Sequence, residues 1–281
     1  MPRSPEPGSL RIAAWNIEHL AAENGMGCAP RDDAGYQRVT AIIDEVGADI
    51  WLLQEIENEA ALARVFDPSQ WTFHVEARPA GEPGAYPLSR GRDDGTRLTM
   101  QSTAIAVRRG IDHVALPALA ELDVEGQDRL RWGVAITLTG ETPLDLMSIH
   151  LKSGCFSGDD APACPVFFDQ VPVLESWIDE RNAAGRGVIV GGDFNRRLEV
   201  DGDSVWLDLN DGDPAPLRLA GAGIGPRCNP RYAEFIDFIM LNEEAARQKV
   251  DGSFSETTFS GPRERHPSDH CPIAVDVAWP G

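Results

Sequence analysis

Short apolar segments that adjoin an acidic, amide or imidazole side chain recur along this chain of 281 residues, and this repetition constrains its fold most strongly. A run of four to eight apolar residues is typical of a buried strand. The adjoining polar residues are Asn16 in WNI, Glu55 in LLQE, His150 in MSIHL, Asp193 and Asn195 in VIVGGDFN, Asp237 in FIDFI, and Asp269 and His270 in PSDHCPI. Because the ends of neighbouring strands lie side by side, we expect these side chains to converge in one pocket.

Each of these residues also has an ordinary explanation when it is taken alone. Asn16 can cap a turn, and Asp193 with Asn195 can form an Asx turn. A single histidine such as His150 is more often a hydrogen-bonded structural residue than a catalyst. The recurrence of the pattern favours one shared site over several unrelated turns.

The order of the expected elements predicts an α/β fold. Strands are expected at residues 10–17, 49–54, 71–75, 102–108, 131–138, 144–149, 187–191, 235–241 and 271–279. Helices are expected at residues 32–46, 57–66, within 167–184, and at 204–209. Asp32 or Asp33 can cap the first helix and Gly47 ends it, whereas Pro172 kinks the third helix or marks its first turn.

The chain is expected to form one domain preceded by a short tail. Residues 1–9 are Pro-rich and predict a flexible tail, and residues 76–100 predict a long surface loop. No linker, repeat or low-complexity block follows the tail. The sequence therefore predicts a single domain over residues 10–281.

The charge of the chain excludes some classes of function. With 45 acidic and 25 basic residues the formal net charge is −20, which argues against a polybasic membrane binder and against a protein that coats nucleic acid by charge alone. No run approaches the 18 apolar residues of a membrane-spanning helix, so we expect no stable membrane association. A bound cation would reverse the local sign, so an enzyme acting on phosphate is still compatible with this charge.

The polar residue types fit metal-assisted attack of water on phosphorus. Glu55 offers the carboxylate oxygen that suits Mg²⁺ or Mn²⁺, and two histidines give an acid–base pair near neutral pH. Asp237 and Asp269 can orient the histidines or hold a second cation, and Asn16 and Asn195 offer amide donors to a phosphate oxygen. The sequence has no G-x-S-x-G, H-E-x-x-H or G-x-x-x-x-G-K-[ST] motif that would favour another chemistry.

Five cysteines bear on the compartment: Cys28, Cys155, Cys164, Cys228 and Cys271. Cys155 and Cys164 flank a short polar loop and are expected to form a disulfide, which favours an oxidising compartment over five reduced thiols. The first nine residues contain no apolar signal-peptide core. We therefore expect a secreted or periplasmic bacterial protein whose signal peptide is not part of this chain, with a cytoplasmic protein as the alternative.

The motifs WNI, LLQE, HLKSG, GGDFN, FID and SDHCPI, in this order, closely resemble the endonuclease/exonuclease/phosphatase superfamily. That superfamily includes pancreatic-type deoxyribonucleases, abasic-site endonucleases, neutral sphingomyelinases and inositol polyphosphate 5-phosphatases. The resemblance extends from Trp15 to Ile273. It implies a four-layered α/β sandwich, in which two mixed sheets pack face to face with helices outside and the active site lies at one end.

The resemblance also implies roles for the residues that match the motifs. Glu55 resembles the main metal ligand, with Asn16 beside it. Asp193 resembles the residue that orients or activates the attacking water, and Asn195 resembles a phosphate contact. Asp269 is similar to an acidic residue that holds metal or orients a histidine.

Two histidines match catalytic positions of the superfamily. His270 resembles the histidine placed against the scissile phosphate, with Asp237 as its carboxylate partner. His150 resembles the second histidine of the deoxyribonuclease and sphingomyelinase branches, whereas the abasic-site branch has a tyrosine there. Arg131, which is expected to open a strand, resembles an arginine that deoxyribonucleases use on phosphate, or is a surface arginine. Lys152 is expected to share a strand face with His150 and support the phosphate, or to be solvated.

The sequence departs from the deoxyribonuclease pattern at its cysteines. Deoxyribonucleases have a cysteine shortly after GDFN, whereas Arg196 and Arg197 stand there in this chain. Cys228 resembles their other cysteine, with Cys28 as one candidate partner, and Cys271 is expected to be a buried thiol. Arginines near the motifs are expected to form a basic rim or to pair with surface carboxylates.

Together these observations predict a Mg²⁺- or Mn²⁺-dependent phosphoesterase whose preferred substrate is a phosphodiester in nucleic acid. The runner-up is a phosphomonoesterase acting on sugar phosphates or nucleotides, or a sphingomyelinase-like phospholipid diesterase. A non-catalytic binding module is disfavoured because Glu55, Asp193 and His270 are all present. No feature of the sequence indicates a protein partner.

Overall fold

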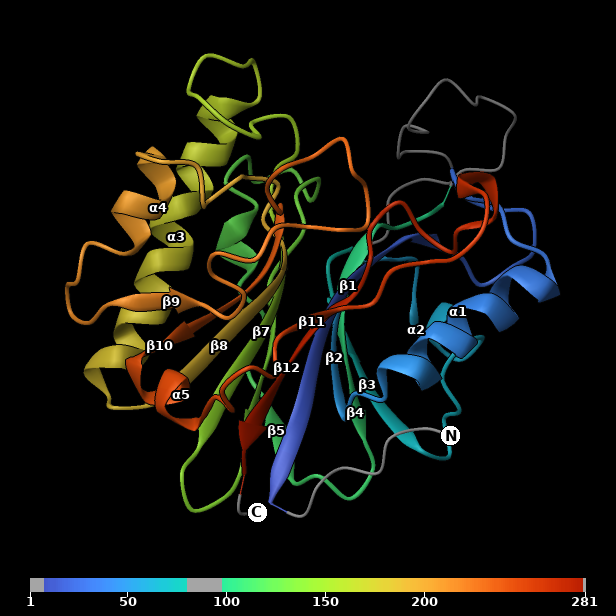
Figure 1. Ribbon diagram of the computed structural model, residues 1–281, viewed down its shortest axis with the longest axis horizontal. Coiled ribbons are helices and arrows are strands. Elements are labelled where there is room, and N and C mark those ends of the chain that lie inside the picture. The colour runs from blue at the N-terminus through green and yellow to red at the C-terminus, as the bar shows by residue number, and fades with distance from the viewer. Residues whose placement is uncertain (1–7, 80–97, 280–281) are drawn as a thin grey trace.

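Two six-stranded β-sheets pack face to face and helices cover their outer faces in the computed structural model, which describes residues 8–79 and 98–279 (Figure 1). The first sheet has the order β11 (Ser255–Glu256), β12 (Ile273–Ala278), β1 (Ser9–Leu20), β2 (Ile50–Ile56), β4 (Ser102–Arg108), β3 (Trp71–Val75). The second has the order β5 (His113–Ala115), β6 (Val134–Leu138), β7 (Leu144–His150), β8 (Gly187–Asp193), β10 (Asp237–Asn242), β9 (Leu217–Leu219). The predicted four-layered α/β sandwich is confirmed.

Both sheets are mixed, and their central parallel pairs bring the predicted polar residues to one end. β1 is parallel to β2 and β7 is parallel to β8, while the other paired strands are antiparallel. The register pairs His150 at the end of β7 with Asp193 at the end of β8, and Asp193 in turn with Asp237 at the start of β10. Three of the motifs therefore meet at one edge of the second sheet.

The core lies between the sheets, and a second core lies under the helices of the first sheet. Along β1, Ile12 and Ala14 pack toward the second sheet, whereas Ala13 and Trp15 pack with Tyr36 of the covering helix. A strand that is buried on both faces needs apolar residues at every position. This double burial explains the unbroken apolar run at the start of β1.

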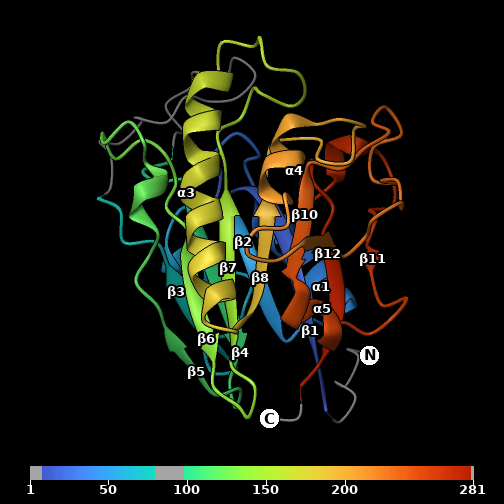
Figure 2. The same ribbon diagram turned by 90° about the vertical axis from the view of Figure 1, so that its left-hand side faces the viewer.

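The helices cover the outer faces of the sandwich: α1 (Asp33–Val46), α2 (Glu59–Leu62), α3 (Cys164–Ala183), α4 (Ser204–Leu209) and α5 (Glu243–Gln248). Asp32 caps α1 by accepting a hydrogen bond from the Gly35 amide, and Gly47 ends the helix at φ +60°, as the sequence predicted. α3 runs along the outer face of the second sheet (Figure 2). It continues through Pro172, so the prediction that this proline marks a first turn is wrong, since Pro165 occupies that turn.

Other predicted bounds need correction. The helix expected at 57–66 is only the single turn α2, and β6 begins at Val134 instead of residue 131. The strands β5, β9 and β11 and the helix α5 were not predicted, because elements of two to six residues carry no clear periodicity. Ser9, expected in the tail, opens β1, while residues 1–7 of that tail and residues 80–97 of the predicted surface loop lie outside the described residues. Among the described helices, none has the length and apolar character of a membrane span.

Candidate active site

A cavity of about 560 Å³ lies at the end of the sandwich where β1, β7 and β8 terminate (upper end in Figure 1). Every predicted site residue except Asp237 lines it: Asn16, Glu55, Arg131, His150, Lys152, Asp193, Asn195, Asp269 and His270. Asp237 lies directly behind His270 and is hydrogen-bonded to its ring. The structure therefore brings all of the predicted residues together.

Asp193 lies close to several of the other polar side chains of this cavity. Its Oδ2 accepts a hydrogen bond from the Asn16 amide at 3.1 Å and lies 3.4 Å from Nε2 of His150 and 3.9 Å from Nε2 of His270. Burial, with a contribution from the neighbouring carboxylate of Asp237, raises the pKa of Asp193 to about 7 against the opposing effect of His270. A carboxyl group with such a pKa can exchange a proton near neutral pH.

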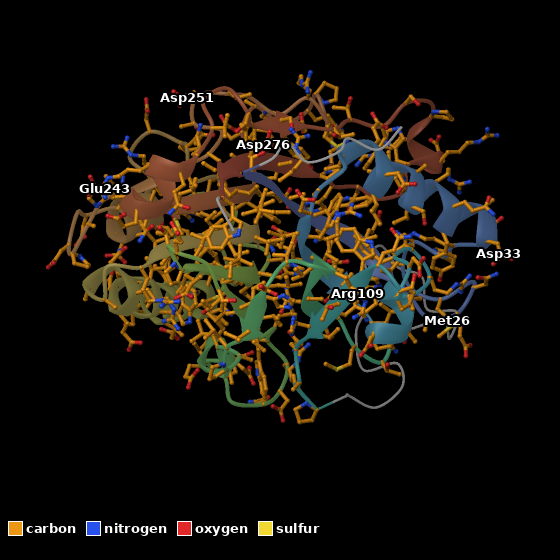
Figure 3. The ribbon with its side chains drawn as sticks, turned by 90° about the horizontal axis from the view of Figure 1, so that it is seen from below. Met26, Asp33, Arg109, Glu243, Asp251 and Asp276 are labelled. Carbon is orange, nitrogen blue, oxygen red and sulfur yellow. A yellow bond between two sulfur atoms is a disulfide. The ribbon has the colours of Figure 1, made fainter. Side chains whose placement is uncertain are left out.

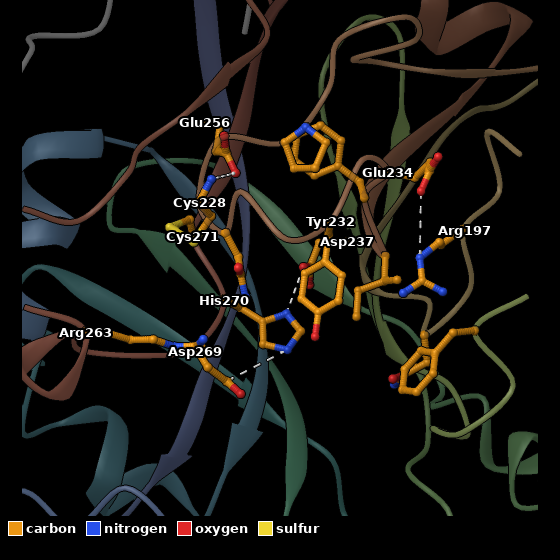
Figure 4. Close-up of a pocket in the computed structure, with 16 residues that line it drawn as sticks. Arg197, Cys228, Tyr232, Glu234, Asp237, Glu256, Arg263, Asp269, His270 and Cys271 are labelled. Carbon is orange, nitrogen blue, oxygen red and sulfur yellow. Dashed lines mark hydrogen bonds and ion pairs between the residues drawn. A yellow bond between two sulfur atoms is a disulfide. The ribbon is translucent and has the colours of Figure 1, made fainter.

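His270 and Asp237 form a closely hydrogen-bonded pair (Figure 4). His270 Nδ1 lies 2.8 Å from Oδ2 of Asp237, which leaves Nε2 facing the cavity and Asp193. Burial acts to lower the pKa of His270, but the carboxylates of Asp237, Asp193 and Asp269, with Asp237 foremost, together hold the pKa well above its usual value. His270 is therefore protonated at neutral pH.

His150 behaves in the opposite way. Burial, together with the positive charge of Arg131, lowers the pKa of His150 well below its usual value, so the ring is neutral at pH 7. Its Nδ1 is buried and finds no hydrogen-bond partner in residues 8–79 and 98–279. The cavity thus holds one cationic and one neutral histidine on either side of Asp193.

The GGDFN segment owes its shape to one glycine and one left-handed turn. Gly192 has φ +143°, and a Cβ atom there would lie 2.1 Å from the Ile149 carbonyl and 2.7 Å from the Gln54 amide. Asn195 has φ +53°, and its backbone N–H donates to Oδ1 of Asp193 at 2.9 Å. The Asx turn that the sequence allowed is therefore present, and the same residues also line the cavity.

His19 belongs to the cavity and was not predicted. The backbone N–H of His19 donates to Oε2 of Glu55 at 3.1 Å, and its ring Nε2 lies 3.6 Å from the same oxygen. Its Nδ1 accepts from the Cys28 amide, so in the neutral ring the proton resides on Nε2, which lies 3.0 Å from the side-chain amide of Gln101 and farther from Glu55. β1 was expected to end at residue 17, but it continues to Leu20. The only sequence signal for His19 was its place in the WNIEHL segment.

Strained backbone is concentrated around this cavity. Five described residues other than glycine have positive φ, and four of them line it: Glu18, His19, Glu55 and Asn195. Arg31 holds the turn at residues 17–19 by donating to the carbonyls of Ile17, Glu18 and His19, and it also reaches the Pro267 carbonyl at 2.6 Å. A buried guanidinium thus ties this turn to the loop that carries Asp269 and His270. Left-handed residues that surrounding structure enforces are typical of functional sites.

The two predicted cationic residues lie at the cavity but not in strands. Arg131 precedes β6, and its Nη2 donates to the Leu151 carbonyl at 3.0 Å. Lys152 lies beyond the end of β7, because its backbone N–H donates to Gln170 instead of a neighbouring strand. The expected sharing of a strand face with His150 is therefore wrong, although both residues line the cavity.

Two disulfides occur beside the cavity. Cys155 is bonded to Cys164, as predicted. Cys228 is bonded to Cys271, so the expectation of a buried Cys271 thiol is wrong, and Cys28 is not the partner of Cys228. The second bond joins residues 43 apart in sequence, and spacing alone did not indicate it.

The arginines near the motifs divide between the two expectations. Arg196 is buried and pairs with Asp203 at 2.7 Å, and Arg227 lies 3.7 Å from Glu256. Arg263 is exposed, lines the hollows beside the cavity, and forms no ion pair with any described carboxylate. Pairing is therefore found for Arg196 and Arg227, whereas the basic rim stays a prediction.

Several oxygen atoms that line the cavity are of the kind that a hard divalent cation prefers. Glu55 and Asp269 offer carboxylates and Asn16 an amide oxygen, which are the ligands that Mg²⁺ and Mn²⁺ prefer. Oε1 of Glu55 accepts no hydrogen bond from the part of the chain that the structure describes. A second group of potential ligand atoms, within 4.8 Å of one another, comes from Asp193, Asp237 and His270.

The fold and this cavity define a hydrolase of phosphate ester bonds that is similar to divalent-metal-dependent enzymes. The endonuclease/exonuclease/phosphatase family matches residues 13–270, and the chain belongs to that family. No curated protein sequence matches the chain.

Solved structures share the fold at low sequence identity. Truncated TDP2 from Caenorhabditis elegans is 19% identical, with a TM-score of 0.62 over 96% of this chain and 98% of that one. An endonuclease/exonuclease/phosphatase from Bacteroides vulgatus is 15% identical, with a TM-score of 0.63 over 96% and 98%. The AP endonuclease LMAP from Leishmania major is 13% identical, with a TM-score of 0.63 over 97% and 88%. At these identities the likeness concerns the fold alone.

Proposed function

We propose that this protein is a Mg²⁺- or Mn²⁺-dependent phosphodiesterase that hydrolyses nucleic acid by attack of water on phosphorus. The observation that carries the proposal is the arrangement around Asp193, whose Oδ2 lies within 3.9 Å of the Asn16 amide and of two histidines with opposite pKa shifts. Two histidines in different protonation states beside one carboxyl group suit a reaction that needs both an acid and a base.

Glu55, Asn16 and Asp269 would hold the cation. When bound, the cation neutralises charge on the non-bridging oxygens of the phosphate. His19 fixes the Glu55 carboxylate through its backbone N–H. This contact orients a metal ligand in the way that outer hydrogen bonds commonly do in metal sites.

The remaining residues would handle the phosphate and the protons. Asp193, with a pKa of about 7, orients the water and accepts its proton. His270, cationic at neutral pH, stabilises the charged phosphorane and donates the proton to the leaving oxygen. Neutral His150 and the Asn195 amide contact the non-bridging oxygens.

Cationic side chains beside these residues support a nucleic-acid substrate. Arg129, Arg131 and Lys152 line the cavity of a chain whose formal net charge is −20. Guanidinium groups bind phosphate oxygens in a fixed fork, so a concentration of them here favours a substrate with several phosphates. The name of the AP endonuclease from Leishmania major is consistent with this choice.

The test is nicking of supercoiled plasmid DNA with Mg²⁺ or Mn²⁺, with an EDTA lane and the His270→Ala variant as controls. We expect metal-dependent relaxation, reduced by a factor of about 10²–10⁴ in the variant, which is the usual effect of losing a general acid. Absence of nicking with either metal would contradict the nuclease assignment. Phosphomonoesters or phospholipid head groups would then be the substrates to test.

We also propose that the protein works in an oxidising compartment, because the Cys155–Cys164 and Cys228–Cys271 disulfides flank the site. Thiol labelling of denatured protein, purified without reductant, should modify one cysteine, and labelling after reduction should modify five. Five labelled cysteines without reduction would contradict the proposal.

A further inference from the structure

Phe156 and Tyr232 expose their rings beside the catalytic histidine. They are 39% and 52% exposed, and they are the only aromatic side chains among the exposed large hydrophobic residues of the described chain. Both line a second cavity, of about 290 Å³, which adjoins the first (Figure 4). Exposed aromatic rings are unfavourable in water, so two of them at one cavity indicate a ligand with an apolar face.

The Arg197 guanidinium lies near both rings. Its guanidinium carbon is 5.7 Å from the ring centre of Phe156 and 5.6 Å from that of Tyr232, within the distance for cation–π attraction. Its only ion pair within the described residues is a loose one, 3.9 Å from Glu234 (Figure 4). Arg197 thus contacts both rings, and we call these three side chains the stacking platform.

The chain holds this platform in place through the two arginines that depart from the deoxyribonuclease pattern. Arg196 is buried and donates to the carbonyls of Cys155 and Gly158, which fixes the disulfide loop that carries Phe156. The Arg197 backbone N–H donates to the Phe156 carbonyl at 2.9 Å. A platform fixed in advance loses little conformational entropy when a ligand stacks on it.

The second cavity opens onto the phosphate site. His270, Asp269 and Asn195 line both cavities, so a phosphate held beside His270 places one of its ester groups at the stacking platform. Asn229 and Arg263 line the same cavity and offer hydrogen bonds to the edge of a planar ring. Sugars and acyl chains have no flat π-face, whereas every nucleobase has one.

We propose that Phe156, Arg197 and Tyr232 form a subsite that stacks one unpaired nucleobase next to the scissile phosphate. The inference rests on the proposed nucleic-acid function and deepens it, because it specifies a substrate whose base has left the helical stack. Single-stranded nucleic acid meets this requirement, since its bases stack readily on aromatic and arginine side chains.

The experiment is a scan of base removal. A labelled single-stranded oligonucleotide with one preferred cut is compared with versions that carry a tetrahydrofuran abasic unit at one position on either side of the cut. For the wild type we expect kcat/KM to fall about 5- to 150-fold at one position adjacent to the cut, the range for stacking of one base on an aromatic ring. In Tyr232→Ala and Phe156→Ala the same base removal should cost less than about twofold.

Matched variants separate the platform from general effects. Leu207→Ala removes a side chain that is 61% exposed on α4 and outside both cavities, and it should keep the full wild-type dependence on the base. Tyr232→Phe keeps the ring and should keep the dependence as well. Base removal that costs the wild type nothing, or that costs Tyr232→Ala as much as the wild type, would overturn the subsite alone.

The outcome for the wild type also separates the subsite from the proposed function. A protein that cuts no oligonucleotide with Mg²⁺ or Mn²⁺ loses the nucleic-acid function and the subsite together. Hydrolysis of sphingomyelin vesicles in that case would reassign the exposed rings to membrane contact. Cutting that depends on the base supports both proposals.

Discussion

Strand β7 has a buried polar residue at each end of the sandwich, and the two residues differ in how fully they are hydrogen-bonded. Asp145, near its start, is 2% exposed, and both carboxylate oxygens are occupied: Arg186 donates to each at 2.6 Å. His150, at the other end, is 4% exposed, and its Nδ1 has no partner in the described chain. Both residues are therefore buried, but only Asp145 has a hydrogen-bond partner for each polar atom of its side chain.

The wider surroundings repeat this contrast. Asp276, on the side of the molecule opposite the cavity (Figure 3), also accepts from an arginine, with Arg11 Nε 2.7 Å from its Oδ1. At the cavity end, Asp193 has a pKa of about 7, and Glu55 and Asn195 adopt left-handed backbone. Buried charge alone does not indicate function. Incomplete pairing, a shifted pKa and strained backbone at the same place do.

Replacing one carboxylate with an amide at each end tests whether the two ends of the molecule differ in function. For the cavity end we choose Asp237→Asn, which removes the negative charge beside His270. His270 then loses the foremost of the carboxylates that raise its pKa, and turnover at pH 7 should fall by a factor of about 10²–10⁴. Steady-state cleavage of plasmid DNA measures this loss.

A pH profile tests the cause of that loss. With the pKa of His270 lowered, activity should be lost at a lower pH on the alkaline side of the profile in Asp237→Asn than in the wild type, because the imidazolium gives up its proton earlier. The thermal midpoint of unfolding should stay near that of the wild type. Turnover above a tenth of the wild-type rate at pH 7 would contradict the role of the pair.

For the opposite end the matching variant is Asp145→Asn. An amide cannot accept at both positions from the Arg186 fork and the Thr137 hydroxyl, so buried donors lose partners. The free energy of unfolding should fall by about 1–3 kcal/mol, with turnover per folded molecule unchanged. Urea unfolding and activity on the same sample measure both. A loss of turnover without a loss of stability would erase the distinction between the two ends.

The motif residues were predictable because each adjoins a recognisable strand. Strand-end placement was enough to bring Asn16, Glu55, His150 and Asp193 to one cavity, because parallel strands end at the same edge of a sheet. The sandwich itself was predicted from the resemblance of the motifs, while apolar periodicity predicted most of the long strands.

What escaped prediction depends on contacts between distant segments. His19 enters the cavity through a left-handed turn that Arg31 holds from outside the strand. The stacking platform joins Phe156, Arg197 and Tyr232, whose spacing in sequence follows no helical or strand period. Such groupings depend on tertiary packing, so a local sequence pattern does not predict them.

A further variant tests Glu55 as a proposed metal ligand. Glu55→Gln keeps the size of the side chain and removes its charge, while the His19 N–H still finds an oxygen to donate to. The Mg²⁺ concentration for half-maximal activity should rise at least about tenfold, since even outer contacts of metal ligands have effects of this size. A metal titration of activity measures the shift. His113→Gln, far from the cavity, serves as the control and should leave the titration unchanged.

The smallest expected effect concerns a pair of histidines away from the cavity. His74 on β3 and His113 on β5 join the edges of the two sheets, with their Nε2 atoms 2.9 Å apart. Because Nδ1 of His113 donates to the Ile111 carbonyl, Nε2 of neutral His113 accepts from Nε2–H of His74. Burial and the neighbouring ring lower the pKa of His74, so the folded state binds its proton less readily than the unfolded state. The stability from this pair is therefore present above the ordinary histidine pKa of about 6.5 and is lost as the pH falls through the lowered pKa.

We expect the free energy of unfolding to fall more between pH 7 and pH 5 in the wild type than in His74→Gln, whose amide N–H donates to the same nitrogen without titrating. The difference should be at most about 1 kcal/mol, the size of one hydrogen bond. Urea unfolding at both pH values measures it. Equal pH dependence in the two proteins would show that titration of His74 does not contribute to the stability of the fold.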